Sequence, residues 1–577
     1  MNYATSPIQT TGQIALPAWR SRVLYVLLLA GLVALLARAV YLQGINNNFL
    51  QQKGDARYGR VVEIHAHRGM ITDRHGEPLA VSTPVESVWA SPGDVEVSSS
   101  QIAQLAQIVG LSAAEVRAKL SDTSREFVYL KRQLPPEQAA KVVRLAIPGV
   151  SLQREYRRYY PGGEVTSHLI GFTDVDDNGQ EGIEFALQAQ LGGKPGSQQV
   201  IRDRRGYIVQ DVASLRAPKE GGDVALSIDS KIQSLAFREI KQAVEQHKAK
   251  GGSIVVLDAK TGEVLALANW PSYNSNNRDK PGVAVLRNHA VTDQFEPGST
   301  MKPFTIATAL EAGKIKPNTV INTAGGTLTL GGRTINDTHP ERSLTVAQVI
   351  QKSSNVGTAK IALGLPPETL WHGLSDSGFG SLTGSAFPGE APGKLRDFKT
   401  WRPIEQATMS YGNGISVNLL QLARAYTVFA NNGELMPVTL LKQDMPATGV
   451  RVFSETTAQE VRDMMETVVR PGGTAPLAQI TGYRVAGKTG TAHKLENGKY
   501  VNHYVASFVG LAPASNPRLI VAVMINDPDG REYYGGLVAA PVFSNVMGAS
   551  LRMLSVPNDA PLDNVIQAPG EIIGEEV

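Results

Sequence analysis

The chain has 577 residues, which is too long for one ordinary domain and predicts two or three folded units. Hydrophobic residues make up 42% and charged residues 19%, a balance typical of globular protein rather than of a disordered chain. The formal net charge of +3 gives no indication of nucleic-acid binding. The sequence contains no cysteine, which excludes disulfides, thiol catalysis and cysteine metal sites.

An apolar run from Val23 to Leu42 is the first clear element of the chain. It has about 20 residues, enough to cross a hydrocarbon core of about 30 Å. Arg38 lies near the C-terminal end of the run, where its long side chain can reach the lipid headgroups. The run predicts a transmembrane helix, with a buried soluble helix or a cleavable signal peptide as alternatives. Ala37 and Ala39 have the spacing of small residues that a signal peptidase prefers.

Nearby charges do not decide the direction of this helix across the membrane. Arg20 and Arg22 precede the run and Lys53 and Arg57 follow it, so the basic residues on the two sides are nearly balanced. A short leader before the helix and a much longer chain after it favour a signal anchor with the bulk of the protein exported.

The region from 44 to 222 alternates short strand-like runs with glycines and polar helices. Ser112 to Leu120 predicts a helix, because Ser112 suits the N-cap and Glu115 follows at the spacing of a capping box. The run Lys219 to Gly222 interrupts these patterns and predicts a domain boundary.

A strand, a helix and a hairpin follow this boundary. Asp223 to Ile228 alternates like a strand, and Asp229 caps a helix that runs to about Gln246. The apolar runs Ser253 to Leu257 and Glu263 to Ala268 are joined by a polar turn, which predicts a β-hairpin.

The last part of the chain predicts three strands and a closing helix. The strands cover Tyr483 to Thr491, Tyr504 to Leu511 and Leu519 to Ile525, and the helix covers about Ala540 to Leu554. Strands at both ends of the region with helices between them predict an α/β domain whose antiparallel sheet is closed by its terminal segments and covered by helices. The residues 561–577 are rich in Pro, Gly and Glu and predict a disordered tail.

The chemistry is predicted from a serine and a lysine three residues apart. Ser299 and Lys302 precede an apolar helical run from Pro303 to Leu310, so the two side chains share one face of the helix. A lysine made neutral by burial or by a nearby cation is a base that can take the proton of a serine nucleophile. Ser-x-x-Lys alone is a weak signal, because a helix-starting serine followed by a solvated lysine produces the same match.

A second pattern, Ser-x-Asn, occurs at several places downstream and upstream of this pair. The match at Ser353 and Asn355 is selected because it follows a helical stretch, 347–352, on the C-terminal side of Ser299. A hydroxyl there can relay a proton to the leaving amine, and the amide can bind the substrate backbone.

A third pattern, Lys-Thr-Gly, occurs twice. The copy at Lys260 lies in the turn of the predicted hairpin, whereas Lys488 to Thr491 lies on a late strand. We expect an inner strand there, with a glycine that allows close approach of the substrate backbone and a lysine that attracts a carboxylate.

Ser-x-x-Lys, Ser-x-Asn and Lys-Thr-Gly in this order are the signatures shared by penicillin-binding proteins and serine β-lactamases, which the chain therefore resembles. The segment Arg68 to Ala80 resembles the opening motif of class B penicillin-binding proteins. Ser-Ser-Asn-Val-Gly from Ser353 is similar to the division-specific branch, penicillin-binding protein 3, because the elongation branch usually has aspartate in place of Asn355. The resemblance reaches from the anchor to about residue 555, and the other segments that carry it are Tyr160–Gly163, His168, Gly171 and Gly182–Glu184.

This resemblance implies an α/β penicillin-binding/β-lactamase-like transpeptidase domain on an elongated α+β pedestal, with one N-terminal transmembrane helix. The implied parts are a cytoplasmic stub at 1–22, an anchor at 23–43, a periplasmic pedestal of the class B dimerisation type at 44–222, a transpeptidase domain at 223–560 and the tail at 561–577.

The resemblance also implies the roles of individual residues. Ser299 would form an acyl-enzyme with Lys302 as general base, supported by Ser353, Asn355 and Lys488 as the other catalytic residues. The backbone N–H groups of Ser299 and Thr491 would form the oxyanion hole. The implied substrate-binding residues are Thr489, Gly490, Thr491, Tyr504, Tyr533 and Tyr534, with core packing as the alternative for the three tyrosines.

The function implied is that of a peptidoglycan D,D-transpeptidase that cross-links stem peptides during septal wall synthesis and is inhibited covalently by β-lactams. It would lie in the inner membrane with its catalytic domain in the periplasm, and act with a SEDS-type glycosyltransferase and other division proteins. No cofactor and no nucleic acid are implied.

Two other functions remain as alternatives: a serine β-lactamase or D,D-carboxypeptidase of the same fold, and a non-enzymatic penicillin-sensing or scaffold protein. Tyr411-Gly-Asn413 imitates an element of one β-lactamase class, but Ser353 and Asn355 already occupy that role. Between Asn355 and Lys488 the chain has no Glu-x-x-x-Asn, the element with which another β-lactamase class activates water.

Two patterns that suggest metal sites are declined, so no metal is expected. The run from Asp174 copies the first half of a calcium loop, but its twelfth position is Phe185, with Glu184 one place early. His65 and His67 lack a third ligand at suitable spacing.

Overall fold

The computed structural model describes residues 18–45, 59–202, 208–278, 282–445, 447–496, 498–529 and 532–562. They form two compact units, each with a core of its own. The first unit comprises Met1–His65, Val85–Glu155 and Pro195–Pro218, and the second comprises Ala66–Pro84, Tyr156–Lys194 and Lys219–Val577. Most of the predicted stub and nearly all of the predicted tail lie outside the described residues.

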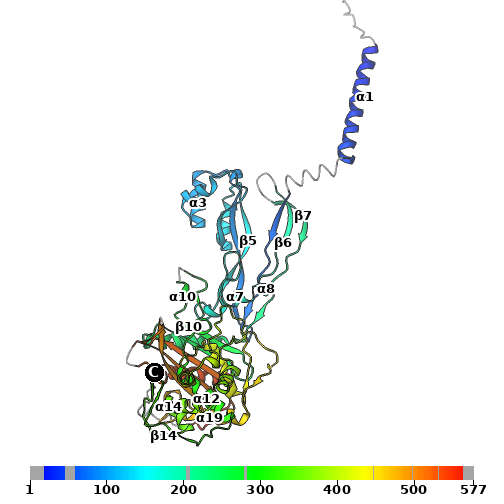
Figure 1. Ribbon diagram of the computed structural model, residues 1–577. Coiled ribbons are helices and arrows are strands. Elements are labelled where there is room, and N and C mark those ends of the chain that lie inside the picture. The colour runs from blue at the N-terminus through cyan, green and yellow to red at the C-terminus, as the bar shows by residue number, and fades with distance from the viewer. Residues whose placement is uncertain are drawn as a thin grey trace, which may run out of the picture. The chain divides into compact units, whose positions relative to one another are not determined.

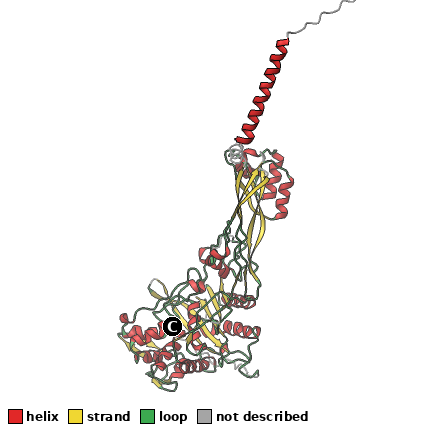
Figure 2. Ribbon diagram, turned by 90° about the vertical axis from the view of Figure 1, so that its right-hand side faces the viewer, coloured by secondary structure: helices red, strands yellow, loops and turns green. Residues whose placement is uncertain are grey.

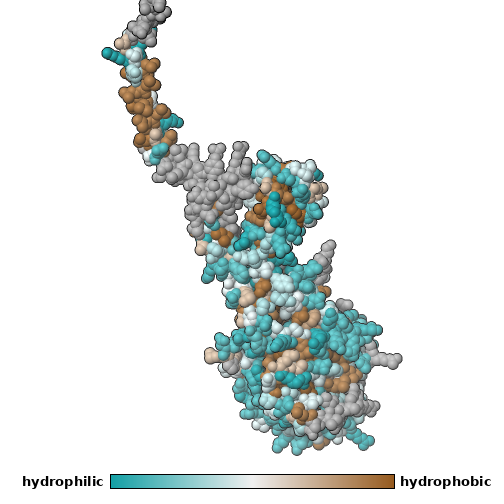
Figure 3. Space-filling view, turned by 180° about the vertical axis from the view of Figure 1, so that it is seen from behind, coloured by the Kyte–Doolittle hydropathy of each residue, from teal (hydrophilic) through white to brown (hydrophobic). Residues whose placement is uncertain are grey.

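The apolar run near the N-terminus forms helix α1, Ala18–Val40, which continues into a π-helical turn at Tyr41–Ile45. Helix α1 is apolar over most of its surface (Figure 3), and none of its residues is buried against the described chain. The stretch Ala18–Gly44 is long and apolar enough to cross a membrane. These properties agree with the predicted transmembrane helix and contradict the alternative of a buried soluble helix.

The first unit contains two small sheets and a set of short helices. One sheet has the order β1-β6-β7, and in the other β4 and β5 pair with β3. Strands β3 and β5 each contribute residues to both units. The bounds are β1 Gly59–Ile64, β3 Pro78–Ala90, β4 Val128–Leu134, β5 Val150–Tyr159, β6 Gly196–Arg202, β7 Ile208–Arg216, η2 Pro92–Asp94, α3 Ser99–Val109, α4 Ala113–Leu120 and α5 Pro136–Arg144.

Helix α4 in this unit begins where its sequence predicts. The Ser112 side chain accepts a hydrogen bond from the backbone N–H of Glu115, and the Glu115 carboxylate accepts one from the backbone N–H of Ser112. This capping box satisfies two of the N–H groups at the helix start, which have no partner within the helix. The predicted helix and its cap are confirmed.

The second unit is built on a five-stranded antiparallel sheet with the order β10-β9-β19-β18-β17. Its strands are β9 Gly251–Asp258, β10 Val264–Trp270, β17 Ala486–Glu496, β18 Lys499–Ala512 and β19 Leu519–Asn526. The predicted hairpin is the β9–β10 pair, and β9 also pairs with β19, so early and late segments close one sheet. The predicted α/β fold with a sheet closed by its terminal segments is confirmed.

Every residue of β9 is buried, which shows that both faces of the sheet are covered at this strand. Helix α9, Ser230–Gln246, begins at the predicted cap Asp229 and packs with α21, Ala540–Met553, on the sheet. Helix α17, Leu419–Ala425, packs on β9 and β19. Figure 2 shows the strands in yellow surrounded by red helices, and Figure 1 labels α12, α14 and α19 near the sheet.

The other elements of the second unit are short. The helices are α6 Ser167–Ile170, α7 Gly182–Ala186, α8 Gln188–Leu191, α10 Val283–Leu286, α11 His289–Thr292, α12 Lys302–Glu311, α13 Val346–Gln351, α14 Asn355–Leu363, α15 Pro367–Asp376, α16 Pro403–Ser410, α18 Thr427–Ala430, α19 Glu455–Glu466 and α20 Gly535–Val538. The strands are β2 Ile71–Thr72, β8 Val224–Ala225, β11 Val320–Asn322, β12 Thr327–Leu330, β13 Arg333–Asn336, β14 Ser343–Thr345, β15 Glu434–Leu435 and β16 Val450–Arg451. The 3₁₀ turns are η3 Gly298–Met301, η4 Phe398–Thr400, η5 Thr467–Val469 and η6 Pro476–Ala478.

The structure corrects two predictions about strands. The run Asp223 to Ile228 forms only the two-residue strand β8, which pairs in parallel with β2. Strand β17, expected inside the sheet, is an edge strand. Its residues from Ala486 to Ala492 are buried like those of an inner strand, but the burial comes from packing against the η3 turn and helix α19.

Candidate active site

Ser299 lies in the η3 turn, directly ahead of helix α12. The sequence predicts a position on a helix shared with Lys302, whereas Ser299 occupies the 3₁₀ turn that leads into that helix. Gly298 has φ of 55°, a left-handed conformation that favours glycine, and a Cβ there would lie 3.1 Å from the Thr491 carbonyl oxygen. The turn is therefore held close against the edge of β17, and Ser299 is almost fully buried.

Lys302 is fully buried, and its amino group contacts the nucleophile candidate. The distance from Lys302 Nζ to Ser299 Oγ is 2.7 Å. The same Nζ lies 2.9 Å from Ser353 Oγ and 2.5 Å from the Ser353 carbonyl oxygen. The helical spacing predicted from the sequence therefore brings the two side chains into contact.

Ser353 lies between α13 and α14 with φ of 59°, which is strained for a residue other than glycine. The next residue holds this backbone in place: Ser354 Oγ donates to Asp337 Oδ2 at 2.6 Å and accepts from the backbone N–H of Gly357 at 2.8 Å. Ser353 Oγ consequently accepts hydrogen bonds from Lys302 Nζ and from Lys488 Nζ, each at 2.9 Å.

The hydrogen-bond chain continues from Lys488 to a residue that sequence analysis missed. Lys488 is fully buried, and its Nζ donates to Thr489 Oγ1 at 3.1 Å. Thr489 Oγ1 in turn lies 2.7 Å from Thr474 Oγ1, in the buried loop before η6. Thr474 follows an ordinary Pro-Gly-Gly loop pattern, so nothing in its own sequence context indicates this contact.

A cavity of about 220 Å³ opens at Ser299. Asn355 is in its wall, with Nδ2 3.4 Å from the Asn336 carbonyl oxygen. Tyr411 and Asn413, set aside during sequence analysis, also line it, and burial raises the pKa of the Tyr411 hydroxyl. The described residues of the wall are Gly298, Ser299, Thr334, Ile335, Asn336, Asn355, Tyr411, Asn413 and Thr491.

The structure does not bring every predicted binding residue to this cavity. Thr491 lines it, but Thr489 and Gly490 are absent from its described wall. A Cβ on Gly490 would lie 2.7 Å from the Pro297 carbonyl oxygen and 2.5 Å from Ser507 Oγ. The glycine therefore permits the close approach of the η3 turn.

The three predicted tyrosines form a cluster of half-buried rings beside this part of β17. Tyr504 stacks on Tyr533 with 4.2 Å between ring centroids, and Tyr533 lies 4.5 Å from Tyr534. The backbone N–H of Gly535, next in the chain, donates to Thr491 Oγ1 at 3.1 Å. The cluster is thus adjacent to Thr491, but none of its rings is in the described wall of the cavity.

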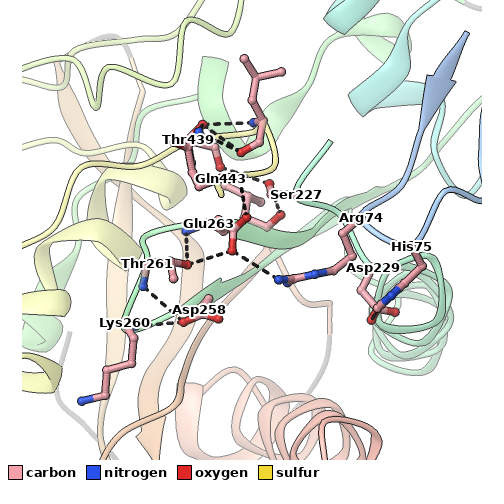
Figure 4. A network of polar contacts seen from close by, with 12 residues as sticks. Arg74, His75, Ser227, Asp229, Asp258, Lys260, Thr261, Glu263, Thr439 and Gln443 are labelled. Carbon is pink, nitrogen blue, oxygen red and sulfur yellow. Dashed lines mark hydrogen bonds and ion pairs between the residues drawn. The ribbon is translucent and has the colours of Figure 1, made fainter. Parts of the chain in front are cut away.

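The earlier Lys-Thr-Gly pattern belongs to a separate structural network (Figure 4). Glu263 Oε2 accepts from Thr261 Oγ1 at 3.0 Å and lies 3.3 Å from the Arg74 guanidinium, while His75 Nε2 lies 3.1 Å from Asp229 Oδ2. Lys260 points away from these contacts (Figure 4). Within the predicted opening motif, Arg74 thus contacts the turn between β9 and β10 through Glu263, and His75 contacts the start of α9 through Asp229.

The declined metal pattern forms a turn. Asp174 Oδ1 accepts hydrogen bonds from the backbone N–H groups of Asp176 and Asn178, both at 2.9 Å. Across the described part of the chain, no three His, Asp or Glu side chains are grouped so as to hold a metal ion.

This geometry is compatible with a serine nucleophile activated by a buried lysine. Comparison with known proteins identifies the class of protein. A model of the penicillin binding protein transpeptidase domain matches residues 252–548, and a model of the penicillin-binding protein dimerisation domain matches residues 63–226. The chain belongs to the penicillin-binding protein transpeptidase family.

Individual relatives show which members of this family the chain is similar to. The chain is 45% identical over 561 residues to the "Probable peptidoglycan D,D-transpeptidase PenA" of Neisseria meningitidis, covering 96% of this chain and 95% of that protein. It is 43% identical over 550 residues to the peptidoglycan D,D-transpeptidase FtsI of Escherichia coli, covering 94% and 93%. The transpeptidase domain of penicillin-binding protein 3 from Burkholderia pseudomallei is 50% identical, with a TM-score of 0.54, and its match covers 58% of this chain and 98% of that one. The resemblance to division-type class B proteins is confirmed.

Proposed function

We propose that this protein is a peptidoglycan D,D-transpeptidase that cross-links stem peptides during septal wall synthesis through an acyl-enzyme on Ser299. The observation that carries the proposal is the contact of 2.7 Å between Lys302 Nζ and Ser299 Oγ, within a hydrogen-bond chain that reaches Lys488. The names of the PenA and FtsI relatives support the reaction class.

In the first half-reaction, Lys302 takes the proton of Ser299. Its burial and the proximity of Lys488 both disfavour the charged ammonium form, which leaves a lone pair to accept that proton. Ser299 Oγ attacks the carbonyl carbon of the penultimate D-alanine, and the backbone N–H groups of Ser299 and Thr491 stabilise the oxyanion. The intermediate collapses to an ester as the bond to the terminal D-alanine breaks, and the proton returns through Ser353 to the leaving amine.

In the second half-reaction, the amine of a neighbouring stem peptide attacks the ester and regenerates Ser299. Lys488 and the two threonines Thr489 and Thr491 hold the terminal carboxylate of the donor before it leaves, and Asn355 holds its backbone. The aromatic cluster of Tyr504, Tyr533 and Tyr534 bounds the substrate beyond Thr491. A β-lactam enters by the same attack, but its amine stays tethered and obstructs the acceptor.

The same proposal covers location and partners. Helix α1 anchors the chain in the inner membrane, with a cytoplasmic stub at 1–22, a periplasmic pedestal at 44–222 and the catalytic domain at 223–560. The relatives named FtsI support a role in division, in which a SEDS-type glycosyltransferase supplies the polymerised glycan.

The test is cross-link formation by the purified full-length protein in detergent. A donor peptide ending in D-Ala-D-Ala is mixed with an acceptor amine, and free D-alanine and the new amide are measured together. We expect both products in equal amounts. Release of D-alanine without amide in excess acceptor would indicate a carboxypeptidase instead.

A further inference from the structure

A second cavity, of about 520 Å³, lies beside the catalytic one in the same unit. Its wall includes Glu296, three residues before Ser299, and Ala492, which directly follows Thr491. Gly414 in its wall directly follows a residue of the catalytic cavity. The two cavities therefore lie along the same three chain segments, close to one another.

The second cavity combines an apolar floor with a basic rim. Among the residues that line it, Phe295, Ile415, Ala492 and Val505 are buried. The rim carries three cations, Lys394, Arg396 and Lys494. No carboxylate of the described chain lies within ion-pair distance of any of the three.

Glu296, the carboxylate among the described lining residues, is hydrogen-bonded to two other residues of the same wall. Its Oε1 accepts from the backbone N–H of Gly414 at 2.8 Å, and the Tyr500 hydroxyl lies 3.1 Å from its Oε2. Burial raises the pKa of the Glu296 carboxyl above its usual value. Glu405 interacts electrostatically with Arg396 without forming an ion pair, so the basic charge of the rim is only partly compensated. A concave site with an excess of positive charge attracts an anion.

Because β17 is an edge strand, a substrate peptide can run along it from the catalytic cavity towards the second cavity. An extended peptide can add to an edge strand, as in β-augmentation. If the terminal carboxylate of the donor lies at Lys488 and its reacting carbonyl at Thr491, the residues before that carbonyl pass Ala492 to Leu495. These residues of β17 line the second cavity.

We propose that the second cavity binds a free carboxylate of the donor stem peptide, on a residue N-terminal to the D-Ala-D-Ala end. This inference rests on the proposed function, because it takes Ser299 as the point of attachment. Arg396 and Lys494 hold the carboxylate, and the apolar floor receives the aliphatic part of the same residue.

The experiment compares two synthetic donor peptides that end in D-Ala-D-Ala and differ only in one upstream group, a free carboxylate or its amide. The full-length protein is assayed for kcat/KM of D-alanine release from each. We expect the carboxylate peptide to be favoured about fivefold, the size of one or two partly exposed ion pairs, and the preference to shrink at high salt.

The variant Arg396→Gln/Lys494→Gln should react with both peptides at one rate, close to that of the original protein with the amide peptide. The amide peptide thereby reports whether the variant is folded and active. The matched control is Lys399→Gln, an exposed lysine that does not line the second cavity, and it should keep the preference.

Three outcomes overturn the inference. Equal rates for the two peptides with the original protein, or a preference that survives the double substitution, would contradict it while leaving the proposed function intact. If neither peptide releases D-alanine, the proposed function is contradicted, and the inference with it.

Discussion

In the proposed reaction, single hydroxyl and amino groups carry the chemistry. Ser353 Oγ lies between the amino groups of Lys302 and Lys488, and each contact is 2.9 Å. Two buried ammonium groups this close repel one another, which favours loss of a proton from one of them. Lys302 is the one that contacts Ser299, so it is the group we expect to be neutral before acylation.

Lys302→Arg should therefore be almost as inactive as Lys302→Ala, because a guanidinium keeps its proton near pH 7 and cannot act as a base. The measurement is the second-order rate of labelling by a fluorescent penicillin. Lys314→Arg, at an exposed position just after α12, is the matched control and should label normally. An active Lys302→Arg variant would exclude lysine as the base.

Thr474→Val should slow labelling about fivefold, because the hydroxyl that contacts Thr489 is lost and a buried hydrogen bond contributes about 1 kcal/mol. Thr474→Ser restores a hydroxyl and should recover most of the rate. The double variant with Thr489→Val should be little slower than Thr489→Val alone, because Thr474 acts through Thr489. Additive losses would show that the two residues act separately.

At the scale of elements, the site depends on the packing of the η3 turn against the edge of β17. The Ser299–Lys302 pair was predictable because both residues lie within one helical turn. The caps of α4 and α9 were also predictable, because each cap side chain binds a backbone N–H group only two or three residues further along the chain. Strand order was not, because the burial of β17 comes from η3 and α19 rather than from a second neighbouring strand. Tyr411 and Asn413 were recognised as a pattern but rejected, because Ser353 and Asn355 already filled that role, and the structure places both in the cavity wall. Thr474 was missed because a loop distant in sequence brings it to Thr489.

Gly490→Ala tests this packing. The added Cβ would meet the Pro297 carbonyl oxygen and Ser507 Oγ at less than contact distance, so the η3 turn must shift. We expect a loss of about 1–3 kcal/mol in the free energy of unfolding and a large loss of penicillin labelling. Gly282→Ala, where a Cβ would meet nothing within 4 Å, should change neither quantity. Normal labelling by Gly490→Ala would contradict the account of the β17 edge.

At the scale of the whole molecule, the order of anchor and catalytic unit along the chain was evident from the sequence. The apolar run predicted the helix α1, although the helix begins at Ala18 rather than Val23. Local charges did not predict the orientation, because the basic residues on the two sides of the run are nearly balanced. Ala37 and Ala39 have the spacing of a signal-peptidase site, so a cleaved signal peptide is the alternative to an intact anchor.

The proposed orientation places the catalytic unit outside the cytoplasm, so a reporter that is active only after export should be active when it is fused after Val577. Sequencing the N-terminus of the mature protein should recover the intact apolar run. A cytoplasmic reporter would reverse the orientation, and a mature chain beginning near Val40 would replace the anchor with a cleaved signal peptide.

The central claim is that Ser299 forms an acyl-enzyme that an amine, rather than water, resolves. The protein is reacted with a penicillin, free drug is removed, and mass spectrometry follows the adduct and its position over time. We predict a penicilloyl group on Ser299 that persists for minutes to hours, and no adduct with Ser299→Ala, whose loss of the nucleophile should cost about 10⁶ in rate. An adduct on another residue, or recovery of unmodified protein within seconds as in a β-lactamase, would contradict the claim.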